Sequence, residues 1–222
     1  MIIDATFVTS AARAGDLPRE GLAEIAVVGR SNVGKSSLIN ALVRQRVART
    51  SAAPGKTRLA NVYRVARGSG VPFYLVDLPG YGFARGGRDA AREFEKLGRA
   101  YFGRVSRVSQ AGQVGKKTPG VAALLLIDAR HIGLQNDLEA WRWLKATVDR
   151  AAIVATKTDK LSRAERLRAL KANEAAFEHP VWPVSANTGE GLDQLWKLIE
   201  QLLNPNHNNP RRSRPPLPHQ KS

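Results

Sequence analysis

The amino-acid sequence predicts an α/β fold of three layers, in which helices cover both faces of a mostly parallel sheet. Short apolar runs with the length of buried strands alternate with segments whose apolar residues have helical spacing. Such alternation favours parallel strands joined by helices. Polar and glycine-containing segments also follow several predicted strands directly, which indicates a ligand site at the carboxyl edge of the sheet.

The predicted elements follow one another with short connections. After a short edge segment at residues 7–11, strands are expected at 25–28, 60–66, 71–76, 121–127, 151–155 and 181–184, and helices at 37–43, 88–102, 134–148, 162–177 and 191–203. A short turn at 67–70 makes the second and third strands one antiparallel hairpin. Residues 1–22 are predicted to be an N-terminal extension, 23–203 a single domain, and 204–222 a disordered basic tail.

Charge and composition narrow the classes of function. The 222-residue chain has a formal net charge of +16, which favours a polyanionic partner such as nucleic acid or an acidic membrane surface. Acid-free basic stretches at 44–58, 103–120 and 204–222 carry most of this charge. The chain has no cysteine, which excludes disulfides and thiolate metal sites. No apolar run approaches the ~18 residues of a membrane-spanning helix, and the start lacks the basic residues of a signal peptide, so we expect a cytoplasmic protein.

The segment between the first predicted strand and helix fits the phosphate-binding pattern G-x-x-x-x-G-K-[ST]. It reads Gly29-Arg30-Ser31-Asn32-Val33-Gly34-Lys35-Ser36. Its glycines let backbone N–H groups surround phosphates at the positive end of the following helix. Lys35 is expected to reach the β- and γ-phosphates, and the Ser36 hydroxyl to bind Mg²⁺. The sequence therefore predicts a P-loop nucleoside triphosphatase.

Two later segments complete the predicted phosphate and metal site. Asp77-Leu78-Pro79-Gly80 ends a predicted strand, where the carboxylate would orient the Mg²⁺ shell and the Gly80 N–H would sense the γ-phosphate. The connection before the hairpin contains Gly55, Lys56, Thr57, Arg58 and Leu59. The Thr57 hydroxyl is the second predicted Mg²⁺ ligand, supplied by a segment that moves on hydrolysis.

The base is predicted from the ends of two further strands. Thr156-Lys157-Thr158-Asp159 follows a buried strand, and Val184-Ser185-Ala186 ends the last one. The Asp159 carboxylate can accept from both N1–H and the exocyclic amine of guanine, donors that adenine lacks. Lys157 can lay its aliphatic stem along the base, and a backbone N–H after Ser185 can meet the guanine oxygen. Alone, T-K-x-D also fits a helix N-cap; together with the phosphate motifs it indicates GTP and GDP.

With these motifs, the chain resembles the translation-factor-related GTPases, and in particular the YihA/EngB/YsxC family of bacterial GTP-binding proteins. The resemblance covers roughly residues 5–203 and rests on G-R-S-N-V-G-K-S-S, P-G-K-T, D-L-P-G-Y-G-F-A, D-A-R-H, T-K-T-D and S-A-N. It implies a Ras-like G domain, Mg²⁺-dependent GTP binding and a role in assembly of the large ribosomal subunit, with links to cell division and septation. We expect hydrolysis to be slow, because the sequence shows no positioned glutamine or arginine finger. We also expect the protein to act as a monomer.

The catalytic residue remains unassigned. Tyr81 stands directly after Gly80, so the chain lacks the glutamine that orients the attacking water in Ras. Asn32 is similar to the asparagine with which some related GTPases hold a potassium ion. A plain loop-stabilising asparagine is the alternative for that position.

Contacts to ribosomal RNA are predicted on the helix expected at 88–102. Its basic residues Arg88, Arg92, Lys96 and Arg99 are spaced by four, four and three and share one face. A solvated face is the alternative. Two other functions stay open: a basic RNA-binding module with a vestigial nucleotide site, and a P-loop small-molecule kinase, which would need an acceptor site and a lid.

Overall fold

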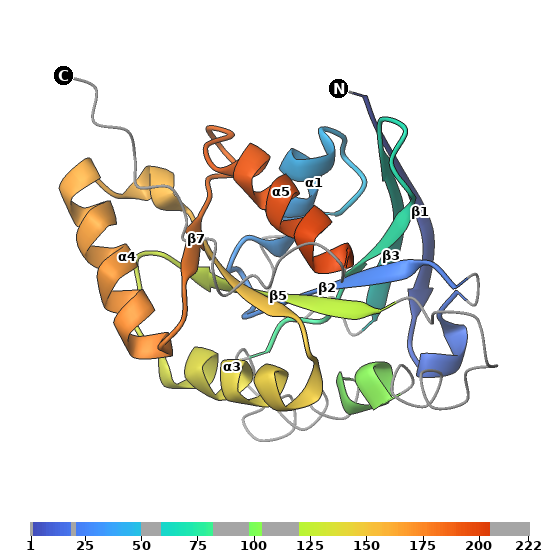
Figure 1. Ribbon diagram of the computed structural model, residues 1–222, viewed down its shortest axis with the longest axis horizontal. Coiled ribbons are helices and arrows are strands. Elements are labelled where there is room, and N and C mark those ends of the chain that lie inside the picture. Colours follow the sequence, from blue (N-terminus) through green and yellow to red (C-terminus); the bar gives the residue numbers. More distant parts are fainter. Residues whose placement is uncertain (1, 19–20, 50–58, 82–97, 104–119, 205–222) are drawn as a thin grey trace.

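One sheet runs through the whole structure, a computed structural model that describes residues 2–18, 21–49, 59–81, 98–103 and 120–204 (Figure 1). Within these residues the sheet has seven strands in the order β1-β3-β4-β2-β5-β6-β7. Their bounds are β1 (Ile3–Ala11), β2 (Ala23–Gly29), β3 (Ala60–Arg67), β4 (Phe73–Asp77), β5 (Val121–Asp128), β6 (Ala151–Thr156) and β7 (Val181–Pro183). The predicted basic tail and the 104–119 segment lie outside the described residues.

Strand β3 is the antiparallel member of this sheet. It pairs antiparallel with β1 on one side and with β4 on the other. Strands β4, β2, β5, β6 and β7 pair in parallel, each with its neighbour. The prediction of a mostly parallel sheet with one antiparallel hairpin strand is therefore confirmed.

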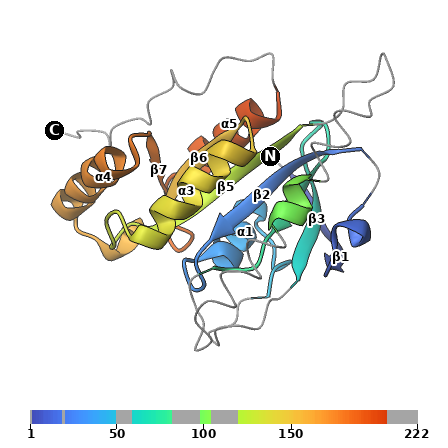
Figure 2. The ribbon, with the colours of Figure 1, turned by 90° about the horizontal axis from the view of Figure 1, so that it is seen from below.

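Helices cover the two faces of the sheet (Figures 1 and 2). Helices α1 (Lys35–Val43) and α5 (Leu192–Leu203) lie on one face, and α3 (Gln135–Thr147), α4 (Arg163–Phe177) and the helical residues 98–103 lie on the other. Strand β5 is buried along its whole length. Its Leu124 and Leu126 face α1 and α5, while Leu125 and Ile127 face α3, because side chains alternate between the faces of a strand. None of the helices in these residues has the length and apolar character to span a membrane.

Helix α5 is held against the sheet by apolar side chains at helical spacing. Leu195, Trp196, Ile199 and Leu202 are buried in the core, and Leu192 packs against it. The Trp196 indole N–H donates to the Leu42 carbonyl at 3.2 Å, which ties α5 to the C-terminal end of α1. This contact fixes the helix that starts at the phosphate loop.

Several element boundaries differ from the predictions; β2 and α1, for example, each begin two residues earlier than expected. The N-terminal edge segment is a strand of nine residues, β1, whose pairs with β3 run from Ile3 with Arg67 to Ala11 with Ala60. Strand β4 was expected to begin at Val71, and this is wrong. Val71 is 84% exposed, and β4 begins at Phe73. Pro72 lies between them and has no N–H for the sheet, which sets the start of the strand after it.

Candidate nucleotide site

The phosphate-binding loop lies between the carboxyl end of β2 and the start of α1. Its turns need positive φ angles at Asn32 (61°) and Gly34 (107°). Gly34 is the N-cap of α1, and glycine adopts this conformation without steric cost. Gly29 is required by close packing, because a Cβ atom there would lie 2.9 Å from the Leu126 carbonyl oxygen of β5. The loop therefore has a fixed path with its N–H groups at the helix N-terminus.

Lys35 extends along the loop from the first turn of α1. Its ammonium donates to the carbonyls of Gly29 at 3.1 Å and Arg30 at 3.3 Å. Burial lowers the pKa of Lys35, and the nearby Asp77 carboxylate opposes that shift. The Lys35 side chain is thus held beside the backbone amides that would receive phosphate.

Asp77 ends β4 and lies next to the phosphate loop because β4 pairs with β2. Its side chain is buried, and within the described part of the chain its Oδ1 has no hydrogen-bond partner. Burial raises the pKa of Asp77 to about 6, partly offset by the charge of Lys35. A buried carboxylate oxygen without a partner is costly, and a hydrated Mg²⁺ would supply what it lacks. The residues present therefore fit Mg²⁺, with Ser36 in the first turn of α1 as the nearby hydroxyl.

The segment after Asp77 approaches the phosphate loop so closely that only glycine fits at position 80. A Cβ atom on Gly80 would lie 2.7 Å from the Ser31 nitrogen. The Ser31 N–H donates to the Tyr81 carbonyl at 3.0 Å, and Arg30 and Tyr81 form a parallel β-bridge. The predicted γ-phosphate sensor and the loop that would hold the phosphates are therefore in direct contact.

The T-K-T-D segment lies at the carboxyl end of β6, against the same loop. The Thr156 hydroxyl donates to the Val33 carbonyl at 2.7 Å. Lys157 adopts a positive φ of 59°, and its ammonium donates to the Asn32 carbonyl at 2.7 Å. A short 3-10 helix (Thr158–Lys160) then carries Asp159. The predicted base motif and the predicted phosphate motif are joined by these two bonds.

Asp159 faces the turn that follows β7. Its Oδ1 accepts a hydrogen bond from the Ser185 hydroxyl at 2.8 Å, and this bond lowers the pKa of Asp159. Ser185 in turn accepts from the backbone N–H groups of Asn187 and Thr188, at 3.2 and 3.1 Å. The carboxylate is therefore oriented and ionised, as recognition of the guanine N1–H and amine requires.

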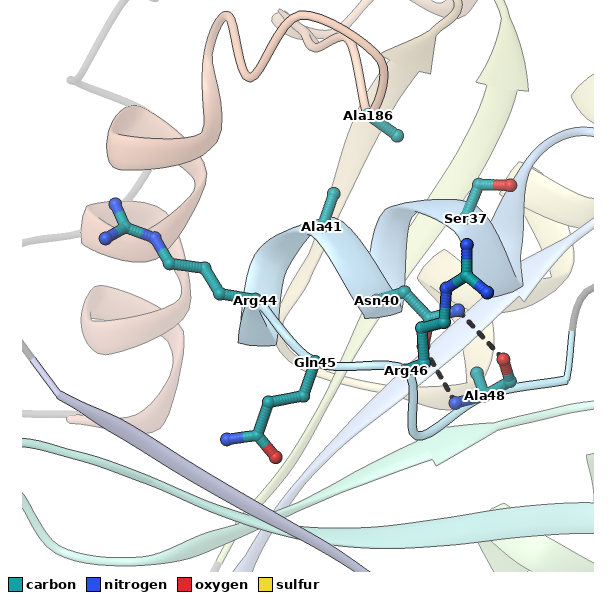
Figure 3. Close-up of a pocket in the computed structure, with 8 residues that line it drawn as sticks. All are labelled: Ser37, Asn40, Ala41, Arg44, Gln45, Arg46, Ala48 and Ala186. Carbon is teal, nitrogen blue, oxygen red and sulfur yellow. Dashed lines mark hydrogen bonds between the residues drawn. The ribbon is translucent and has the colours of Figure 1, made fainter.

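A hollow of about 530 Å³ opens beside α1 (Figure 3). Ser37 of α1 and Ala186 of the turn after β7 both line it. Asn40 closes one side through two hydrogen bonds of 2.8 Å with the backbone of Ala48. Arg46 points toward Ser37, whereas Arg44 extends toward α5. The hollow therefore borders, at Ala186, the turn after β7 that Asp159 faces.

Three comparisons with known proteins agree with this geometry. Residues 24–157 match the family model described as 50S ribosome-binding GTPase. The probable GTP-binding protein EngB of Symbiobacterium thermophilum is 38% identical, over 90% of this chain and 96% of that protein. The chain belongs to the EngB family of GTP-binding proteins. It is thus a member of a GTPase family.

Solved structures share the fold with this EngB-family chain. A crystal structure of a probable GTP-binding protein engB has a TM-score of 0.57 at 22% identity, covering 82% of this chain and 98% of that one. The NFeoB protein of S. thermophilus, in a crystal structure with GDP, AlF4⁻ and K⁺, has a TM-score of 0.57 at 20% identity, covering 85% of this chain and 65% of that one. At these identities the likeness concerns the fold.

The structure brings together most of the site residues predicted for this EngB-family chain. Three groups meet at one edge of the sheet: residues 29–36, residues 77–80, and the base residues 156–159 with 184–186. Leu59 is described and exposed at the start of β3. Two sets of predicted residues lie outside the described residues: Gly55, Lys56, Thr57 and Arg58, and the RNA-contact candidates Arg88, Arg92 and Lys96. The fourth candidate, Arg99, is exposed on the helical residues 98–103.

Asp128 ends β5 and begins the D-A-R-H motif, but it was not among the site residues predicted from the sequence. One of its oxygens lies 3.0 Å from the Lys157 ammonium, and Arg130 donates to it at 2.7 and 2.9 Å. Burial alone would raise the pKa of Asp128, but the hydrogen bonds from Arg130 and Lys157 hold it well below its usual value. A signal for this residue was available, because Asp128 follows a buried strand just as Asp77 and Asp159 do.

Proposed function

We propose that this chain is a GTP-binding switch that hydrolyses GTP slowly with Mg²⁺ and acts in assembly of the large ribosomal subunit. One observation carries the nucleotide part of the proposal. The ammonium of Lys157 bonds to the Asn32 carbonyl of the phosphate loop, and Asp159, two residues on, points an oriented carboxylate at the turn after β7. A base at Asp159 and phosphates at Lys35 can then belong to one guanine nucleotide.

The metal site is proposed from both described and undescribed residues. Ser36 and Thr57 would bind Mg²⁺ directly, and the buried oxygen of Asp77 would accept from a metal-bound water. Mg²⁺ supplies charge neutralisation of the β- and γ-phosphates when it is bound. Among the described residues, the buried Oδ1 of Asp77 has no hydrogen-bond partner, and this supports the assignment.

Slow hydrolysis is proposed because, among the residues that the structure describes, none is placed to orient the attacking water. Tyr81 replaces the glutamine of Ras, and its hydroxyl is buried and donates to Asp137 at 2.9 Å. Potassium is proposed as a further cofactor at Asn32, whose side chain is exposed on the loop. The crystal structure of NFeoB, a protein of the same fold, contains bound K⁺.

The ribosomal partner is proposed from charge and family. The matched family model is described as 50S ribosome-binding GTPase, and a net charge of +16 favours binding to RNA. Arg88, Arg92, Lys96 and Arg99 are the proposed contacts to rRNA of a large-subunit precursor. A cytoplasmic monomer with effects on cell division and septation is part of the same proposal.

Nucleotide titration tests the first half of the proposal. Fluorescently labelled GDP and GTP should bind, and labelled ATP should not. Lys35→Ala should abolish measurable binding, because it removes the fixed cation of the phosphate loop. ATP binding equal to that of GTP would favour the kinase alternative, and absence of all three would favour a vestigial site.

Sedimentation with ribosomal particles tests the second half. The triple variant Arg88→Glu, Arg92→Glu and Lys96→Glu should bind large-subunit precursors more weakly than the parent. Each lost phosphate contact should flatten the dependence of log affinity on log salt by about 0.7 to 0.9. GTP turnover without ribosomes should stay the same. If the variant binds particles like the parent at every salt concentration, another surface contacts the ribosome.

A further inference from the structure

Three side chains from distant parts of the chain meet beside the phosphate loop, and we call them the Arg30–Asp137–Tyr81 cluster. The Arg30 guanidinium Nε donates to both carboxylate oxygens of Asp137, at 2.9 and 3.1 Å. The Tyr81 hydroxyl donates to the same carboxylate at 2.9 Å. Arg30 is the second residue of the phosphate loop, Asp137 lies in the first turn of α3, and Tyr81 directly follows Gly80.

The cluster is well shielded from water. Asp137 is 1% exposed and Tyr81 is 5% exposed. Burial raises the pKa of Asp137, and the Arg30 charge and the Tyr81 hydroxyl oppose that shift. A buried ion pair of this kind adds little to stability compared with an apolar core, and its best-attested use is to fix one arrangement. The question is therefore which arrangement it fixes.

The backbone next to the cluster answers this question. Tyr81 also accepts a hydrogen bond from the Ser31 N–H through its carbonyl, at 3.0 Å. The neighbouring Gly80 touches Ser31 so closely that a Cβ atom could not be inserted. The side chains and the backbone thus hold the same residue, Tyr81, against the phosphate loop from two directions, and Gly80 is fixed between Tyr81 and Asp77.

We propose that Asp137 is a positioning residue that fixes Gly80 beside the phosphate loop and thereby raises the affinity of the site for GTP relative to its affinity for GDP. The inference rests on the proposed function, in which Gly80 meets the γ-phosphate. GDP has no γ-phosphate, so its binding depends on Lys35, the loop amides and Asp159. GTP gains an additional contact with Gly80, and this contact is strongest when Gly80 is already in place. Removing the cluster should therefore lower the affinity for GTP more than the affinity for GDP.

Two variants test the role of the cluster. Tyr81→Phe removes the hydroxyl and keeps the ring, and Asp137→Asn keeps the shape and removes the charge. The matched control is Tyr101→Phe, because the Tyr101 hydroxyl also donates to a carboxylate, that of Glu24 at 2.6 Å. Glu24 lies near the amino end of β2, at the opposite edge of the sheet from the phosphate loop.

The measurement is the affinity of each protein for labelled GDP and for a labelled non-hydrolysable GTP analogue, with thermal unfolding of the nucleotide-free proteins. In both cluster variants we expect the ratio of GTP to GDP affinity to fall about three- to tenfold, with GDP affinity nearly unchanged. The Tyr101→Phe control should keep the parental ratio.

Two outcomes would overturn the inference: an unchanged affinity ratio, which includes an equal loss of affinity for both nucleotides, or a ratio that rises. If Asp137→Asn does not fold, the Tyr81→Phe result decides alone, since that variant loses a single hydrogen bond. Failure of the proposed function looks different, because the parent protein itself would then not bind guanine nucleotides.

Discussion

The ammonium of Lys157 lies 2.7 Å from the backbone carbonyl oxygen of Asn32. This bond joins the segment after β6 to the phosphate loop after β2, although 125 positions separate the two residues along the chain. The same ammonium is paired with the Asp128 carboxylate at 3.0 Å. Lys157 is therefore held between the phosphate loop and the carboxyl end of β5.

Asp128→Asn should lower the affinities for GDP and for GTP to the same degree, by roughly tenfold. The variant removes the charge that holds Lys157 and leaves its ammonium with the Asn32 carbonyl alone; hydrogen bonds to charged groups contribute about 1.5–3 kcal/mol. Isothermal titration with both nucleotides measures the effect. Asp193→Asn, at an exposed position in the first turn of α5, is the control for loss of one negative charge. Unchanged affinities would mean that Arg130 and Asp128 form a separate surface pair.

Asp159→Asn should exchange the base preference from guanine to xanthine. The xanthine C2 carbonyl needs a donor where the guanine amine needs an acceptor, and the Asn amide can donate. Competition of GDP and XDP against a labelled nucleotide measures the preference. A variant that binds neither nucleotide would show that Asp159 acts in folding, through its bond to Ser185.

Asp77 should make the metal-free protein less stable as the pH rises. Its pKa is raised from 3.8 to about 6 in the folded state, so between these values the folded state binds more protons than the unfolded state. The free energy of unfolding then falls with rising pH, by about 3 kcal/mol in total. Urea unfolding in EDTA between pH 4 and 7.5 measures it, with Asp77→Asn as the comparison. A difference between parent and variant that does not change over this range would contradict the raised pKa.

Potassium should raise the rate of GTP hydrolysis over that in sodium if Asn32 holds the ion. The parent rate in sodium should be slow, near the ~10⁻⁴ s⁻¹ of unassisted Ras. Asn32→Gly is the sharpest variant, because glycine keeps the φ of 61° while it removes the amide oxygen. This variant should lose the response to potassium and keep the rate in sodium. Equal rates in the two salts for the parent would remove potassium from the site.

Much of the site could be predicted from the sequence because its parts are local. The phosphate loop needs a strand, two glycines and a helix in immediate succession, and residues 25–43 contain all of them. Asp77, Lys157 and Asp159 each follow an apolar run, and parallel strands bring such ends to one edge of a sheet. The order of motifs and the fold class follow from these short-range patterns.

The partners of these residues could be found only in the tertiary structure. In the sequence, Asp137 is simply an acidic residue in the first turn of a predicted helix. The helix dipole stabilises a carboxylate at such a position in any protein. The contacts of Asp137 with Arg30 and Tyr81 span 107 and 56 positions, so they depend on how α3 packs against the sheet. The same holds for the bonds from Thr156 to Val33 and from Trp196 to Leu42.

By itself, the sequence determined the phosphate loop, the strand ends that carry the site and the type of sheet, since each depends on neighbours within a few residues. Only the tertiary structure decided the length of β1 and the burial of Asp137 and Asp77. Burial and pairing depend on atoms that remote segments contribute. These contacts change the pKa of a carboxyl group and fix the position of Gly80, and the residues next to them in the sequence do not indicate either effect.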